Sequence, residues 1–238
     1  MKNLFLLAVS ITLSINAFAQ EPGFHLGLDL HTKYVWRGME MMDTDATPVL
    51  FPQINYQRHG FSAYVMGGTS LNGKYSEIDL GINYTYRWIS IGINDYYYPM
   101  TTGLNDRYFN FASKETGHWL EGVITASPEK IPVYFLVSTF FYGADRNPDG
   151  HQAYSTYLEL GVHFDFSEHS RIMATLGTAC NKSCYNGYER DFGICNIGLC
   201  YTYELQIFKD RKLPLRVNYI INPLREKPFV DFSTSFTF

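Results

Sequence analysis

Strict alternation of apolar and polar side chains from Pro228 to the last residue is the feature that most limits the fold. One parity holds Val230, Phe232, Thr234, Phe236 and Phe238, and the other holds Asp231, Ser233, Ser235 and Thr237. Successive side chains of a strand point to opposite faces, so this segment predicts a strand with one apolar and one polar face. A half-buried strand of a soluble protein and a strand of a membrane barrel both fit that pattern.

The same alternation recurs along the chain and predicts about 12 strands, within a range of roughly 10 to 14. The first runs from Phe24 to Arg37, which is longer than the five or six residues typical of a soluble strand. A tilted membrane strand needs about 9–11 residues. The predicted strands begin near Phe24, Leu50, Phe61, Glu77, Ile89, His118, Pro132, Tyr154, Ile172, Cys195, Leu215 and Val230.

The connections between these strands alternate between long and short, which favours an all-β, antiparallel, up-and-down transmembrane barrel. Short periplasmic turns and long outer loops are typical of outer-membrane barrels, and they predict that the N- and C-termini are periplasmic. Aromatic residues, 17% of the chain, are expected to form a girdle at each membrane interface. The outer girdle would hold Tyr34, Trp36 and residues 96–98, and the periplasmic one Tyr56, Tyr84, Tyr86, Trp88, Phe166, Tyr201, Tyr203 and Phe238.

Residues 1–19 are predicted to be a signal peptide rather than part of the fold. Lys2 supplies the positive start, an apolar stretch follows, and Ala17-Phe18-Ala19 fits a cleavage site after Ala19. The barrel domain is therefore expected over residues 20–238, exported by the general secretory pathway to a bacterial outer membrane. The formal net charge of −4 gives no reason to expect a nucleic-acid partner.

Two motifs near the start resemble a known family. T-K-Y-V-W-R-G, from Thr32 to Gly38, is followed by H-G-F-S-A-Y-V, from His59 to Val65. This resembles outer-membrane barrels described as TorF-type porins, and the resemblance implies a pore.

The terminal Phe238 likewise resembles the last residue of bacterial outer-membrane barrels, which implies an insertion signal read by the barrel-assembly machinery. Outer-membrane lipid and small hydrophilic solutes or ions would be the other partners; the oligomeric state is left open.

The candidate site consists of charged side chains at the alternate strand positions that are expected to face the barrel interior. The predicted lumen-lining set is Asp29, Lys33, Arg37, Glu77, Asp79, Arg87, Glu121, Glu159, His163, Asp165, Arg216 and Asp231. These residues could form a salt-bridge network that replaces a hydrophobic core, or the lining of a pore, and the two readings are compatible. Large apolar or aromatic side chains are also expected to face inward, which disfavours a wide channel: Trp119, Tyr134, Leu136 and Phe140.

Sequence motifs for other chemistry are absent. None of the histidines lies in the His-x-Ser-Asn segment typical of outer-membrane lipid hydrolases, and no spacing suits a metal site, so no cofactor is expected. Cys180 and Cys184 could form a disulfide in an oxidising compartment, with free thiols as the alternative. Cys195 and Cys200 are too far apart on one strand to pair.

These observations favour a small passive channel. A closed barrel with a structural, adhesive or receptor role through its outer loops is the first alternative. A lipid-modifying enzyme is the second, and it is disfavoured because the catalytic motif is missing.

Overall fold

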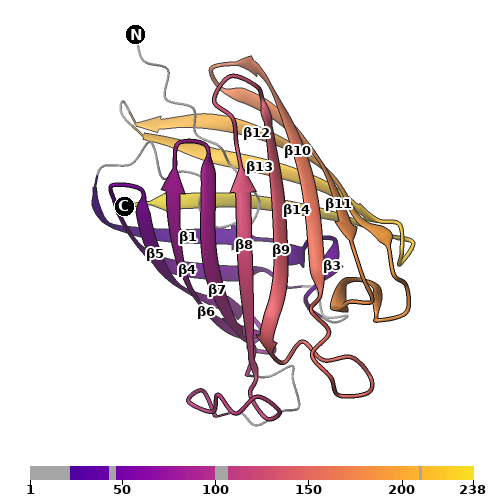
Figure 1. Cartoon of the computed structure of the whole chain (residues 1–238). Coiled ribbons are helices and arrows are strands. Elements are labelled where there is room, and N and C mark those ends of the chain that lie inside the picture. The colour runs from indigo at the N-terminus through magenta and orange to yellow at the C-terminus, as the bar shows by residue number, and fades with distance from the viewer. Residues whose placement is uncertain (1–21, 43–46, 100–106, 209–210) are drawn as a thin grey trace.

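The computed structural model describes residues 22–42, 47–99, 107–208 and 211–238, and these form a closed antiparallel barrel of 12 strands (Figure 1). The predicted all-β up-and-down barrel is therefore confirmed. Among the described residues, no helix is long and apolar enough to span a membrane. The barrel strands are β1 (Gly23–His31), β4 (Val49–Arg58), β5 (Phe61–Ser70), β6 (Ser76–Tyr86), β7 (Ile89–Tyr97), β8 (His118–Ala126), β9 (Val133–Gly143), β10 (Thr156–Ser167), β11 (Ser170–Ala179), β12 (Gly193–Phe208), β13 (Arg211–Asn222) and β14 (Lys227–Thr237).

β1 closes the barrel by pairing with β4 on one side and with β14 on the other. Leu28 lies opposite Pro52 of β4 and opposite Phe236 of β14. The terminal Phe238 extends this last pairing: its N–H donates to the Leu26 carbonyl at 2.9 Å. Closure leaves no unpaired strand edge in the barrel, which removes the usual site of edge-to-edge aggregation.

The two faces of the barrel wall differ as the alternation predicts. On β10, Leu160 is 50% exposed on the outer face whereas its neighbour Glu159 is 5% exposed inside. Ile82, Ile91 and Phe232 repeat this outward exposure on other strands. A continuous exposed apolar belt is far larger than soluble monomers carry, and it is typical of a lipid-facing surface.

The four longest connections of the barrel gather at one end. The long-loop end holds the described residues 32–42, 47–48, 98–99, 107–117, 144–155 and 180–192, and the described part of the connection between β7 and β8 is visible at the bottom of Figure 1. The short-turn end holds residues 59–60, 87–88 and 168–169, together with the start of β1 and the end of β14.

The first predicted strand is corrected by the structure. It ends at His31 instead of Arg37, and the following residues form a small hairpin of β2 (Val35–Trp36) and β3 (Met39–Glu40). Positive φ angles of 50° at Arg37 and 77° at Gly38 match the two-residue turns that suit a twisted hairpin. We call residues 34–40 the lumen hairpin, because its side chains pack inside the barrel.

The outer aromatic girdle is the second correction. Tyr34 and Trp36 were expected on the lipid face, but both are buried among side chains of the barrel interior. Residues 96–98 are buried as well; the ring of Tyr97 is covered by Tyr108 of the following loop, at 5.1 Å between centroids. At the short-turn end the expected girdle residues are exposed, with Tyr56 half-buried; the exposed ones are Tyr84, Tyr86, Trp88, Phe166, Tyr201, Tyr203 and Phe238.

Candidate constriction of the barrel lumen

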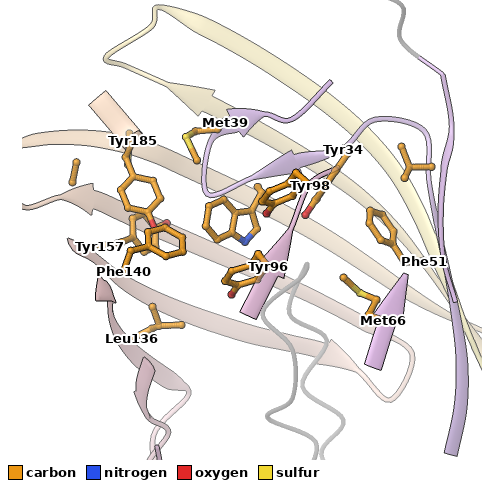
Figure 2. Close-up of a cluster of buried hydrophobic side chains, with 14 of the residues drawn as sticks. Tyr34, Met39, Phe51, Met66, Tyr96, Tyr98, Leu136, Phe140, Tyr157 and Tyr185 are labelled. Carbon is orange, nitrogen blue, oxygen red and sulfur yellow. The ribbon is translucent and has the colours of Figure 1, made fainter. Parts of the chain in front are cut away.

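Aromatic side chains pack around the lumen hairpin and fill the barrel at its level (Figure 2). The ring of Trp36 lies 5.7 Å from Tyr96 of β7, 6.2 Å from Phe140 of β9 and 5.8 Å from Tyr185, measured between centroids. Tyr185 belongs to the short 3-10 turn η1 (Cys184–Asn186), which enters the lumen from the loop after β11. Two connections from the long-loop end therefore meet inside the barrel.

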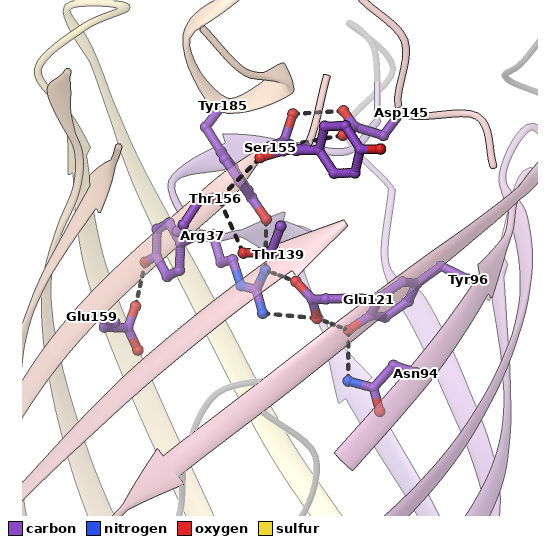
Figure 3. A network of polar contacts seen from close by, with 12 residues as sticks. Arg37, Asn94, Tyr96, Glu121, Thr139, Asp145, Ser155, Thr156, Glu159 and Tyr185 are labelled. Atoms are coloured by element: carbon purple, nitrogen blue, oxygen red, sulfur yellow. Dashed lines mark hydrogen bonds and ion pairs between the residues drawn. The ribbon is translucent and has the colours of Figure 1, made fainter. Parts of the chain in front are cut away.

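Arg37, at the turn of the lumen hairpin, is bound by a buried network (Figure 3). Its Nη1 contacts Glu121 Oε1 of β8, and its Nη2 donates to Glu121 Oε2 at 3.2 Å. Nη1 also donates to the Tyr185 hydroxyl at 2.6 Å, and the Tyr96 hydroxyl donates to Glu121 Oε2 at 2.9 Å. The guanidinium lies 4.3 Å from the Trp36 ring centroid, within cation–π distance. The network ties the hairpin turn to the wall.

Glu159 of β10 has no basic side chain as a partner among the described residues. Its carboxylate accepts hydrogen bonds from the Tyr134 hydroxyl at 2.5 Å, from the Tyr157 hydroxyl, and from Asn196 Nδ2 at 3.0 Å. Glu159 and Arg37 together line a cavity of about 40 Å³, which is the scale of one or two water molecules. The space left beside the hairpin is therefore narrow and polar.

The start of the lumen hairpin is anchored by Asp231 of β14. Asp231 accepts hydrogen bonds from the Lys33 backbone N–H at 3.1 Å and from Asn218 Nδ2 at 3.0 Å, and its Oδ2 lies 2.8 Å from His31 Nδ1. The Thr32 hydroxyl donates to the same carboxylate at 3.3 Å. These contacts turn the chain inward where β1 ends.

The turn of the hairpin is held against β12 and β13. Asn222 Nδ2 donates to the Gly38 carbonyl at 2.9 Å. A Cβ atom on Gly38 would lie 1.9 Å from the Cys195 carbonyl oxygen, so only glycine permits this approach. The hairpin is thus fixed both at its start and at its turn.

Glu77 and Asp79 of β6 are inward and each is 1% exposed. The Tyr75 hydroxyl donates to Glu77 Oε2 at 2.6 Å, while Glu77 Oε1 and Asp79 Oδ1 have no hydrogen-bond partner in the described part of the chain. No ion pair joins either carboxyl to a base among the described residues. The interior therefore carries acidic groups that its bases do not offset.

The short-turn half of the lumen is more open. Asp165 pairs with Arg171 Nε at 2.5 Å and lies 3.8 Å from His163 Nε2. Asp29 accepts from Gln53 at 3.0 Å and is half-buried, as is Arg216, which donates to Ser235 Oγ at 2.8 Å. These polar side chains are partly solvated.

Sequence reasoning assigned some inward residues incorrectly and missed others. Arg87 was predicted to line the lumen, but it lies exposed in the turn after β6, over the Tyr86 ring. Arg171 was missed because the predicted strand began one residue later. Lys33 lies beside the lumen hairpin and pairs with Glu40 rather than lining the barrel wall. The strand parity placed the remaining carboxylates correctly on the inner face, but it gave no sign of the hairpin between them.

All four cysteines are free thiols in the structure, which is one of the two alternatives left open for Cys180 and Cys184. The Cys184 backbone N–H donates to Ser155 Oγ at 3.0 Å. Burial raises the pKa of the Cys184 thiol well above its usual range. Such a thiol is a poor nucleophile near neutral pH. Within the described residues, no group of three or more His, Cys, Asp or Glu side chains is placed to hold a metal ion.

No protein-family model and no curated protein matches the chain, so the resemblance to TorF-type porins stays a prediction. Solved structures with a similar fold do exist. A chain from the work "Unveiling the Mechanism Behind the in-meso Crystallization of Membrane Proteins" aligns with a TM-score of 0.50 and 7% identity, over 90% of this chain and 83% of that one. OccAB3 of Acinetobacter baumannii aligns with a TM-score of 0.41 and 11% identity, over 92% of this chain and 66% of that one.

OccK8 (OprE) of Pseudomonas aeruginosa aligns with a TM-score of 0.41 and 10% identity, over 89% of this chain and 62% of that one. The chain therefore spans about two thirds or less of the length of OccAB3 and OccK8. At such low identity the likeness concerns the fold alone.

Proposed function

We propose that the protein is an outer-membrane barrel that acts as a narrow passive channel for small hydrophilic solutes or ions. The observation that carries this proposal is the arrangement of the wall, with an apolar belt outside and a polar, charged interior within a closed barrel. A water-scale polar space beside Arg37 and Glu159 supports a narrow pathway rather than a wide pore. The lumen hairpin is its constriction.

The orientation in the membrane belongs to the same proposal. Long loops would face the outside and short turns the periplasm, with both termini periplasmic. Residues 1–19 would direct export and be removed after Ala19. Phe238 would be the signal that the assembly machinery reads, and its exposed ring on the closing strand pair is compatible with that role. The TorF-type porins remain the family that the sequence resembles.

Ion selectivity tests the channel proposal. Uncompensated carboxyls inside a low-dielectric passage concentrate cations and repel anions, so we expect a cation preference in planar bilayers under a salt gradient. The preference should weaken as salt rises, because the Debye length falls from about 10 Å at 0.1 M to about 3 Å at 1 M. Glu159→Gln should shift the reversal potential toward zero, because Glu159 has no base as a partner.

Asp149→Asn is the matched control, because Asp149 is an exposed acid of an outer loop. An anion preference in the parent protein, or equal shifts in the two variants, would contradict the proposed lining.

A closed barrel with a receptor role is the second candidate, favoured by one specific observation. Side chains at the level of the lumen hairpin are almost fully buried, including Trp36, Glu121 and Phe140. Absence of any conductance from correctly folded protein would favour this candidate over the channel. Lipid hydrolysis assays on the same sample would test the disfavoured enzyme alternative.

A further inference from the structure

A cavity of about 450 Å³ lies on the side of the lumen hairpin that faces the long loops. Its lining includes Trp36, Met39 and Glu40 of the hairpin, Trp119 of β8, and Tyr188 and Arg225 of two outer connections. Figure 2 shows three of the lining side chains, Met39, Tyr98 and Phe140, within the aromatic cluster. Pockets of roughly 300–1,000 Å³ with aromatic walls and a few polar groups are typical small-molecule sites.

The carboxylate in the lining of the cavity is already paired. Glu40, the acidic residue of the lining, is paired with Lys33 of the same segment. The cavity therefore offers no unpaired carboxylate to a cationic ligand.

Donors, by contrast, remain available. The Arg225 side chain is exposed at the rim, and among the described residues it has no hydrogen-bond or ion-pair partner. The indole N–H of Trp119 also lacks a partner in the described part of the chain. A guanidinium presents paired N–H groups that match the two oxygens of a carboxylate.

We propose that this cavity is a binding site for small aromatic carboxylates. The ring of the ligand packs between Trp36 and Trp119, with the flexible Met39 side chain adapting to its shape. The carboxylate faces the Arg225 guanidinium at the rim. Such a site would serve a channel as a solute dock and a closed barrel as a receptor, so it does not depend on which function holds.

Tryptophan fluorescence can test the site directly, because the chain has 3 tryptophans and two of them line the cavity. Trp88 lies in the turn after β6, at the opposite end of the barrel, and Trp88→Phe removes its signal. The folded variant in nanodiscs is titrated with 4-bromobenzoate, whose bromine quenches an indole that it contacts. We expect quenching that saturates. The non-specific quenching is measured in a control titration of free tryptophan mixed with empty nanodiscs, and it is subtracted.

Related probes separate the charge from the ring. 4-Bromobenzyl alcohol keeps the ring and loses the charge, so it should bind roughly 10- to 150-fold more weakly, the effect of one charge-assisted hydrogen bond. 4-Bromobenzylammonium should bind most weakly. Arg225→Gln should bring the affinity for 4-bromobenzoate down to that of the alcohol and leave the alcohol unaffected.

Two further variants complete the design. Arg146→Gln is the matched control: Arg146 is an outer-loop arginine that donates to the Gly150 carbonyl at 3.0 Å and does not line the cavity. Ala144→Phe places a ring in the space beside Ala144 and should abolish quenching by all probes while the barrel stays folded.

Three outcomes would overturn the proposal: quenching that does not saturate, equal affinity for the three probes, or an unchanged affinity for 4-bromobenzoate in Arg225→Gln. Binding is measured without ion flow, so a failed conductance experiment leaves this result intact.

Discussion

The two halves of the lumen contain ion pairs of the same kind in opposite surroundings. At the hairpin level, the side chains of Arg37 and Glu121 are 5% and 0% exposed, and aromatic rings surround them. Toward the short turns, those of Arg171 and Asp165 are 12% and 31% exposed. Exposed pairs contribute little to stability, whereas removing one member of a buried pair leaves a charge without compensation. The difference indicates that the lumen is narrowed by packing at one level and solvated at the other.

The largest expected effect comes from breaking the buried pair. Arg37→Met leaves the Glu121 carboxylate buried without its base, and we expect a loss of about 3–5 kcal/mol in the free energy of unfolding. The double variant Arg37→Met/Glu121→Leu removes both charges and should recover most of that loss. Urea titration of the refolded barrel in lipid vesicles measures both values, and the single variant Glu121→Leu completes the double-mutant cycle.

A second double-mutant cycle is made on the solvated pair for comparison. It uses Arg171→Met, Asp165→Leu and the combination of the two. Its coupling energy should be at most about 1 kcal/mol. Equal coupling energies in the two cycles would show that the two halves of the lumen are alike, against the structure.

A smaller effect is expected from the turn of the lumen hairpin. Gly38 and Gly73 both have positive φ, 77° and 70°, but a Cβ on Gly38 meets the Cys195 carbonyl whereas nothing lies within 4 Å of one on Gly73. Gly73→Ala should cost about 1 kcal/mol for the backbone conformation alone. Gly38→Ala should cost about 1–3 kcal/mol more, because the hairpin must shift away from β12. Equal losses in the two variants would mean that the hairpin is not held against the wall.

Much of the barrel could be predicted from the sequence because a period of two is easy to read over a whole strand. A strand was predicted to begin near His118, and β8 begins at that residue. The inward carboxylates Glu121 and Glu159 followed from the same parity. The lumen hairpin did not follow, because alternation continues through Tyr34 and Trp36 whether the chain stays in the wall or turns inward.

What decides between those two paths is contact with residues far along the chain. Asp231 holds the segment at its start, 200 residues after His31, and Asn222 holds the turn. A single sequence gives no sign of such pairings. The wrong assignments of Arg87 and Arg171 come from strand bounds that were predicted one residue away from the observed ones. One of these errors placed Arg87 in the lumen, and the other left Arg171 out of it.

The most direct test of the central claim, that the lumen hairpin constricts the barrel, is single-channel conductance with and without it. In one variant residues 34–40 are replaced by Gly-Ser-Gly, and in the control residues 147–151 of an exposed loop at the long-loop end are replaced by the same linker. Heat-modifiable migration establishes that both are folded. The account predicts a conductance several-fold above the parent in the hairpin variant and a parental value in the control. Equal conductance in the parent and the hairpin variant would contradict it.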